Sequence, residues 1–397
     1  MSENEGHRHP LGVALAVSGA AVAGTIAAVA AKRAVVRRLR SPLAERPGTA
    51  RRVRSFDGSE LAVNVVGPLG GAGRNAAGSD HRAPTLVFAH GFSLDMTSWH
   101  YQWKRFSLRH RCVLFDQRGH GLSGPARGGG YSLDALGHDL KAVLDAEVPE
   151  GPAIVFGHSM GGVNILALAA QYPEEFGRRI RAAVLASTAA ADVMKDVLAG
   201  VASRLGRLLV PLPRRLIAHP ERLHDIAFLI TRLTNFGSHA PPSVVEYVAQ
   251  VAARTRATVW ANFLASLATL DLEHALDHIR VPALVLVGDH DCLTPPATAL
   301  AMTRRLPYGR MVVLPGAGHC GLLEHHDDFN AAIEEFLRTV PAQVPDRPST
   351  TAPAARRPSA MERPAASRSP RPAAVHRGRA GRRARVHGRR RQAIPIR

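Results

Sequence analysis

The sequence predicts an α/β protein with a mostly parallel central sheet, helices on both faces and an inserted helical cap. Short continuous runs of Val, Ile, Leu and Phe alternate with segments of helical composition. Such runs are typical of parallel strands buried on both faces, with helices as the connections. Polar, glycine-rich motifs come directly after these runs, at the strand ends where open α/β sheets place their chemistry.

The strongly basic charge of the chain lies in its two flanks. The formal net charge is +19 over 397 residues, with +7 before residue 56, +13 in residues 341–397 and −1 in the region between. A near-neutral centre does not indicate a nucleic-acid-binding domain, and we expect no specific nucleic acid partner.

The N-terminal flank contains an uncharged stretch, Leu11–Ala31, that comes after a polar segment of ten residues. A helix of this length spans about 30 Å, the thickness of a membrane hydrocarbon core. Five basic residues between Lys32 and Arg40 favour a cytoplasmic location for the domain on their C-terminal side. The sequence therefore predicts a single-pass anchor and a basic juxtamembrane linker at residues 32–52.

Two alternatives to the anchor stay open. Ala28-Val29-Ala30 fits the small-x-small cleavage site of a signal peptide, which would make the protein secreted. The stretch could also be a soluble Ala-rich helix packed on the folded domain.

The C-terminal flank, residues 341–397, is rich in Pro, Ala, Ser and Arg and has few large apolar residues. We expect a disordered tail, because such a composition cannot bury enough surface to offset its chain entropy. The three cysteines, Cys112, Cys292 and Cys320, form no zinc-binding or disulfide pattern. We predict no metal and no cofactor.

Between the flanks, the apolar runs and helical segments can be placed in order. The first run, Leu61–Val66, indicates a strand of a starting hairpin. The other predicted strands are Thr85–Ala89, Cys112–Phe115, Ala153–Phe156, Ala182–Ser187, Ala283–Val287 and Met311–Leu314. The predicted helices are Ser98–Ser107, Leu133–Leu144, Val163–Gln171, Pro296–Leu306 and Asp328–Thr339.

The motif that most clearly indicates chemistry is "IVFGHSMGG", Ile154–Gly162. A tight strand–turn–helix connection would raise the Ser159 hydroxyl above the sheet, and small neighbours at Gly157 and Gly161 would let the chains approach. The backbone N–H of Met160 would then point from a helix N-terminus towards a developing oxyanion.

Three other strand ends supply candidate partners in the expected order of nucleophile, acid and base. After the run "ALVLV" comes "GDHDCLTPP", with Asp289 and Asp291. After the run "MVVLP" comes "GAGHCGLLEH", with His319. The turn "HGF" offers the N–H of Phe92 as a second oxyanion donor.

From Val53 to Val340 the chain resembles the α/β-hydrolase superfamily. The matching pieces are "HGF", "DQRGHGLS", "GHSMGG", "GDHDCLTP" and "GAGH". The resemblance implies that Ser159 is the nucleophile and that His319 is the general base.

The resemblance also assigns the supporting groups. It implies that Asp291 orients the imidazole of His319, with Asp289 as the alternative, and that Phe92 and Met160 form the oxyanion hole. "DQRGHG" is similar to a structural turn of the family, and we expect the charges of Asp116, Arg118 and His120 to brace loops.

The family performs several reactions, and the residue at the strand–turn–helix connection, Ser159 here, distinguishes some of them. Ser159 excludes the members that use an aspartate there. We expect a membrane-tethered serine hydrolase, similar to monoacylglycerol lipases and haloperoxidases, that cleaves an apolar carboxylic ester without a cofactor. The alternatives are a peroxidase-like perhydrolase, a carbon–carbon bond hydrolase or a non-enzymatic binding scaffold. Oligomeric state does not follow from the sequence.

The segment at about residues 189–279 is apolar and helix-compatible. Its position between two predicted strands, near the strand ends, predicts a cap that sets specificity. Its apolar residues would line an acyl pocket or pack the small core of the cap.

Overall fold

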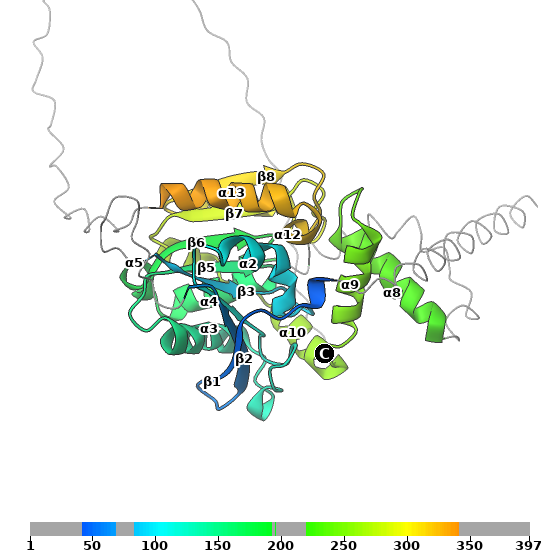
Figure 1. Cartoon of the computed structure of the whole chain (residues 1–397), viewed down its shortest axis with the longest axis horizontal. Helices are drawn as coiled ribbons and strands as arrows, with labels where there is room; N and C mark the ends of the chain where they lie inside the picture. The colour runs from blue at the N-terminus through cyan, green and yellow to red at the C-terminus, as the bar shows by residue number, and fades with distance from the viewer. Residues whose placement is uncertain (1–41, 69–82, 193–194, 196–219, 341–397) are drawn as a thin grey trace, which may run out of the picture. The chain divides into compact units, whose positions relative to one another are not determined.

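In the computed structural model, the described residues are 42–68, 83–192, 195 and 220–340 (Figure 1). The predicted anchor, Leu11–Ala31, and the predicted tail, residues 341–397, lie outside them. Within the described ranges, no helix is both long and apolar enough to cross a membrane. This finding contradicts the single-pass, membrane-tethered location with a cytoplasmic domain, and we withdraw that prediction.

The described chain forms one eight-stranded sheet, with the strand order β1-β2-β4-β3-β5-β6-β7-β8. The first two strands pair antiparallel, and β2 pairs antiparallel with β4. The remaining neighbours are parallel, as predicted. The strands are Thr49–Arg54, Glu60–Val66, Thr85–Ala89, Cys112–Phe115, Ala153–His158, Ile180–Ala186, Ala283–Gly288 and Gly309–Leu314. The sheet thus begins at Thr49, inside the segment predicted as a linker.

The α-helices are α2 His100–Phe106, α3 Leu133–Glu147, α4 Met160–Gln171, α5 Glu175–Arg178, α8 Pro220–Asn235, α9 Pro242–Ala252, α10 Ala257–Ala268, α11 Pro296–Arg305, α12 Gly321–Glu324 and α13 His326–Thr339. Short 3₁₀ helices are η1 Pro42–Ala44, η2 Met96–Trp99, η3 Arg127–Gly129 and η4 Glu273–His278.

Two apolar cores lie on opposite faces of the sheet. In β5, Ala153 and Val155 belong to one core, whereas Ile154 and Phe156 belong to the other. Helices α3, α4 and α11 contribute to the first core, and α2, α9 and α13 contribute to the second. The alternation along β5 has the two-residue period of a strand, so both faces are covered by helices.

Helices α8, α9 and α10 belong to the inserted segment between β6 and β7. Figure 1 shows them grouped at one end of the sheet. The two ends of the insertion meet in an antiparallel bridge between Ala191 and Asp271. The chain therefore leaves and re-enters the sheet layer at one place. We call α8, α9 and α10 the inserted helices; their role as a cap stays a prediction.

Candidate active site

Ser159 occupies the turn between β5 and α4. Its backbone has φ 52° and ψ −118°, a left-handed conformation that non-glycine residues rarely adopt. Its N–H donates to the carbonyl of Ala186 at 2.9 Å, and its own carbonyl accepts a hydrogen bond from Thr188 Oγ1 at 2.7 Å. These bonds from the neighbouring strand end hold a strained conformation of the kind that clusters at functional sites.

Two glycines let the strand and helix meet at this turn. A Cβ atom on Gly157 would lie 2.3 Å from the carbonyl oxygen of Gly161. A Cβ on Gly161 would lie 2.0 Å from the carbonyl oxygen of Ala89. Both distances are far below van der Waals contact, so any larger residue would force the turn apart.

Asp291 and His319 come together at the ends of β7 and β8. Nδ1 of His319 lies 3.0 Å from Oδ2 and 3.1 Å from Oδ1 of Asp291, and both residues are buried. Asp289 does not contact His319. It is exposed, accepts a hydrogen bond from the N–H of Gly316 at 2.7 Å and lies 2.7 Å from Nδ1 of His290.

The Asp291 carboxylate is held by the loop on its C-terminal side. Oδ1 accepts hydrogen bonds from the N–H groups of Leu293 at 3.0 Å and Thr294 at 2.9 Å, and Oδ2 accepts one from Thr294 Oγ1 at 2.9 Å. Burial on its own raises the pKa of Asp291, but the imidazole of His319 and these donors outweigh it and lower the pKa. Sequence reasoning missed Thr294, although it lies within the quoted motif.

His158 is a second residue that sequence reasoning missed, and it joins the serine turn to the histidine loop. Its Nε2 lies 2.9 Å from the carbonyl oxygen of His319. A carbonyl can only accept, so Nε2 carries the proton. Burial lowers the pKa of His158 to about 3, so the ring is neutral at pH 7. The backbone of His319 is therefore fixed by the residue that precedes Ser159.

Oγ of Ser159 and Nε2 of His319 have no hydrogen-bond partner within the described structure. Of the residues that the structure describes, none hydrogen-bonds the Ser159 hydroxyl or Nε2 of His319, and the two groups are not bonded to each other. Such contacts are often loose without substrate and tighten in the complex.

The two predicted oxyanion donors belong to the serine turn and to a turn packed against it. Met160 is the first residue of α4, so its N–H has no partner within the helix. Phe92 comes after Gly91, where an added Cβ would lie 3.3 Å from Cβ of Ser159. The turn that contains Phe92 is therefore packed against the serine turn.

Neutral histidines hold the Phe92 turn in place. Nε2 of His90 accepts the N–H of Gln117 at 3.0 Å, so its Nδ1 donates to the carbonyl of Gly91 at 2.8 Å. Nε2 of His120 accepts the N–H of Ser93 at 3.1 Å. Burial lowers the pKa of His90 to about 4 and the pKa of His120 to about 3. His120 thus braces a loop as expected, but as a neutral ring rather than through a charge.

The charged residues of the same loop also brace it. Arg118 is fully buried and donates two hydrogen bonds, both 2.7 Å, to the two carboxylate oxygens of Asp139. A third bond of 3.0 Å reaches Asp57. Asp116 accepts the N–H groups of Met96 and Leu122, each at 2.7 Å.

An apolar cluster covers the oxyanion side of the site. Its members come from α10, from α3 and the segment before it, and from the start of α4; they are Tyr131, Leu136, Met160, Val259 and Phe263, with Phe92 packed against them. The ring of Phe92 lies 4.5 Å from that of Trp260, centre to centre. Aromatic and aliphatic groups of an inserted helix therefore lie beside a candidate oxyanion donor.

The inserted helices are also hydrogen-bonded to the histidine loop. The N–H of Cys320 donates to the carbonyl of Asn235 at 2.8 Å. The Glu324 carboxylate accepts the N–H of Gly318 at 2.5 Å through Oε1 and the N–H of Gly237 at 2.9 Å through Oε2. The residue before His319 is thus linked through Glu324 to the end of α8.

In the described part of the chain, no group of three or more His, Cys, Asp or Glu side chains is arranged to hold a metal ion. The described polar groups of the site instead suit acid–base and nucleophilic chemistry.

Comparison with known proteins finds hydrolases that share this fold. A curated relative, 3-oxoadipate enol-lactonase 2 of Acinetobacter baylyi, is 28% identical over 258 residues, which are 64% of this chain and 89% of the relative. The solved enol-lactonase of Burkholderia xenovorans aligns with a TM-score of 0.56 at 26% identity, over 72% of this chain and 100% of its own. An esterase from Thermogutta terrifontis, at 24% identity, shares the fold with a TM-score of 0.57 over 74% of this chain and 99% of its own.

Residues 84–326 match the family described as "alpha/beta hydrolase fold", which is more than half of the chain and spans every candidate site residue. The chain therefore belongs to the α/β-hydrolase fold family and is an esterase-like hydrolase.

Proposed function

We propose that the protein is a serine hydrolase that cleaves carboxylic esters of apolar acids through an acyl-enzyme intermediate. The observation that carries the proposal is the strained Ser159 turn, whose preceding residue, His158, is hydrogen-bonded to the backbone of His319. The Asp291–His319 pair completes the three groups that such chemistry requires.

The proposed reaction has two stages, acylation of Ser159 and deacylation by water, and the same groups act in both. Oγ of Ser159 attacks the ester carbonyl carbon as Nε2 of His319 takes the hydroxyl proton. The N–H groups of Phe92 and Met160 stabilise the tetrahedral oxyanion, and His319 returns the proton to the leaving alkoxide. Water, deprotonated by His319, then attacks the acyl carbon; the C–O bond to Ser159 breaks, His319 returns the proton to Oγ of Ser159 and the acid is released. Asp291 stabilises the imidazolium in both stages.

The apolar cluster supports the substrate class. The rings of Trp260 and Phe263 pack against Phe92, the candidate oxyanion donor, so an apolar surface of an inserted helix adjoins this side of the proposed site. We propose that the inserted helices act as a cap over this side of the site and select apolar chains.

Covalent labelling with a fluorophosphonate tests the nucleophile. We expect one adduct, located by peptide mass on Ser159, and none in Ser159→Ala. Ser187→Ala is the matched control, because Ser187 also has a positive φ, 46°, at the end of the adjacent strand. It should be labelled at the wild-type rate. An unlabelled wild-type protein that is folded would favour a binding scaffold.

A series of p-nitrophenyl esters from acetate to decanoate tests the substrate class. We expect kcat/KM to increase with chain length until the acyl pocket is filled. Equal values along the series would contradict an apolar acyl site.

Hydrolysis of a carbon–carbon bond is the second candidate. One relative, the 2-hydroxy-6-oxononadienedioate/2-hydroxy-6-oxononatrienedioate hydrolase of Burkholderia vietnamiensis, is 28% identical over 296 residues, which are 71% of this chain and 93% of the relative. A vinylogous diketo acid of that type, assayed beside the esters, would favour this candidate if it alone is cleaved.

A further inference from the structure

A buried chain of hydrogen bonds joins an inserted helix to the segment that carries Phe92. It begins at Tyr247 in α9, whose hydroxyl lies 2.6 Å from Oγ1 of Thr97. Oγ1 of Thr97 in turn lies 2.5 Å from Oδ1 of Asp95. All three side chains are buried, and the proposed ester hydrolysis assigns none of them a chemical step.

The chain has one direction. A carboxylate can only accept, so the hydroxyl of Thr97 donates to Asp95. Because its proton is used in this bond, Oγ1 of Thr97 accepts from the hydroxyl of Tyr247. Burial raises the pKa of Tyr247 well above its usual value, so the phenol keeps the proton that it donates. The inserted helix is therefore the donor, and the segment after Phe92 is the acceptor.

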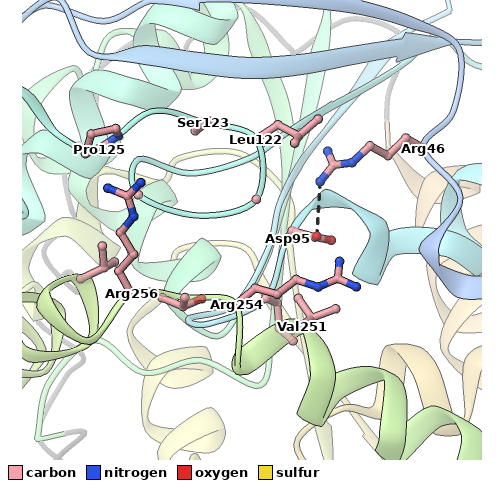
Figure 2. A pocket seen from close by; sticks show the side chains of 13 residues that line it. Arg46, Asp95, Leu122, Ser123, Pro125, Val251, Arg254 and Arg256 are labelled. Carbon is pink, nitrogen blue, oxygen red and sulfur yellow. Dashed lines mark hydrogen bonds and ion pairs between the residues drawn. The ribbon is translucent and has the colours of Figure 1, made fainter. Parts of the chain in front are cut away.

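The acceptor end of the chain is charged and lies next to α9. Asp95 and Asp116 share the guanidinium of Arg46, at 3.3 Å and 2.9 Å, so one arginine serves two carboxylates. A hydroxyl that donates to an ionised carboxylate forms a stronger bond than one that donates to a neutral group. Asp95 and Val251 of α9 also line the same pocket, of about 360 Å³, in which Figure 2 shows the pairing of Arg46 with Asp95.

Asp95 is the residue at which the Phe92 turn ends and the next helix begins. The N–H of Leu94 donates to the carbonyl of Gly91 at 3.1 Å, which closes the turn around Phe92. Asp95 is the N-cap of η2, and its Oδ1 also accepts the N–H of Thr97 at 2.9 Å. A side chain that caps a helix fixes how the chain enters it. A displacement of Asp95 would therefore move the Phe92 turn.

We propose that Tyr247 and Thr97 are positioning residues that couple the packing of α9 to the position of the Phe92 turn. An oxyanion donor acts over a narrow range of distances, so a small shift of the Phe92 N–H would slow the chemical step. The effect on catalysis rests on the proposed function, whereas the coupling between α9 and the turn does not.

Two variants that change little but one hydroxyl test the coupling through kinetics. Tyr247→Phe removes the donor, and Thr97→Val removes the hydroxyl between the two ends. We expect each to lower kcat for a short ester by about three- to tenfold with KM within about twofold, because the chain acts on the turn rather than on substrate binding. The double variant should be no worse than Thr97→Val alone, since both changes break the same chain.

Hydrogen exchange followed by mass spectrometry gives a readout that does not need catalysis. In Tyr247→Phe, exchange should become faster in α9 and also in residues 92–97, and it should do so equally when Ser159→Ala is present. The matched control is Tyr172→Phe, which removes a hydroxyl that lies 2.7 Å from Nδ1 of His138. It should change neither the kinetics nor the exchange of these two segments.

Three results would overturn the coupling. They are unchanged exchange in residues 92–97 of Tyr247→Phe, kinetic effects that simply add in the double variant, and equal effects in the Tyr172→Phe control. Faster exchange in both segments, in a protein whose wild type cleaves no ester, would contradict the proposed function and support the coupling.

Discussion

Two polar clusters lie at the same edge of the sheet and use histidine in opposite ways. The acid–histidine cluster, Asp291, Thr294 and His319, lies beyond β7 and β8. The brace, formed by His90, Gln117 and His120, lies beyond β3 and β4. In both clusters the histidines are buried. In the brace each imidazole has both nitrogens bound to backbone groups. In His319 only Nδ1 is bound, to a carboxylate and a hydroxyl.

This difference decides which ring can carry a proton. A brace histidine that gained a proton would lose an acceptor for a backbone N–H and bury a charge that forms no ion pair within the described structure. At His319 a proton on Nε2 would displace no hydrogen bond within the described structure, and Asp291 would stabilise the charge. The role of a buried histidine is therefore better indicated by what its two nitrogens bind than by its burial.

The largest expected effect is at the histidine that carries the proton. His319→Ala should lower kcat for ester hydrolysis by about 10⁴-fold or more, because the triad acts as a unit. The midpoint of thermal unfolding should stay within a few degrees. A loss of stability as large as that of a brace variant, with activity retained in the folded fraction, would contradict the comparison.

The next largest effect on kcat distinguishes Asp291 from Asp289, the two acidic residues of "GDHD". Asp291→Asn should lower kcat by about 10³- to 10⁴-fold, because an amide favours the wrong tautomer of His319. Asp289→Asn should lower it by less than about tenfold, because the Asp289 carboxylate is exposed and, among the described residues, contacts Gly316 and His290 rather than His319. Steady-state kinetics on one ester compares the two. If Asp289→Asn is the inactive variant, the observed pairing is not the catalytic one.

A brace variant should affect stability before chemistry. His120→Ala leaves the buried N–H of Ser93 without its acceptor and opens a cavity beside Phe92 and Phe263. We expect a loss of about 2–3 kcal/mol in the free energy of unfolding, measured by urea titration. Activity per folded molecule should fall far less than in His319→Ala. Unchanged stability would show that the brace does not hold this loop.

How far the sequence predicts this arrangement differs between the two clusters. The strands and the order of serine, acid and histidine can be predicted from local patterns, because each strand is a continuous apolar run and each motif comes directly after one. The contacts of His158 and Thr294 cannot be predicted from such patterns. They depend on which nitrogen faces which loop, and this is set by strand register.

The inserted helices are the harder part to predict. Their apolar spacing indicates helices, but it does not indicate that Asn235 and Gly237 would bond the histidine loop. Those bonds join segments about 85 residues apart, through a backbone carbonyl and through Glu324. The predicted membrane location is withdrawn because no described helix could cross a membrane, whereas Leu11–Ala31, from which it was predicted, lies outside the described residues.

Acid should destabilise the fold through its neutral histidines. The unfolded rings bind protons below about pH 6.5, whereas the pKa values of the folded rings are about 4 for His90 and about 3 for His120 and His158. The unfolded state therefore binds more protons, and stability falls as pH drops through 6.5. Asp116, whose pKa burial raises to about 6, offsets part of this loss.

Between pH 7.5 and 5.5 we expect these three rings and Asp116 to give a net loss of about 3 kcal/mol, roughly 1.4 kcal/mol for each ring less about 1 kcal/mol for Asp116. Urea unfolding at the two pH values measures it. In His120→Gln, the side-chain oxygen can still accept the N–H of Ser93. This variant should therefore reduce the pH-dependent loss of unfolding free energy by about the contribution of one histidine. Equal stability at both pH values would mean that these rings titrate alike in the folded and unfolded states.

The smallest expected effect lies at the link between the acid–histidine cluster and the inserted helices. Glu324 accepts N–H groups from Gly318 and Gly237 at once, and burial raises its pKa. Glu324→Gln keeps one carbonyl oxygen but turns an amide N–H₂ towards the other donor, so one link is lost. We expect kcat to fall by about three- to tenfold with KM for short esters nearly unchanged, since the change acts on the His319 loop rather than on the substrate. Glu335→Gln, which alters an exposed carboxylate paired with Arg310, is the control and should leave both constants unchanged. A change confined to KM for long esters would instead place the role of Glu324 in the inserted helices alone.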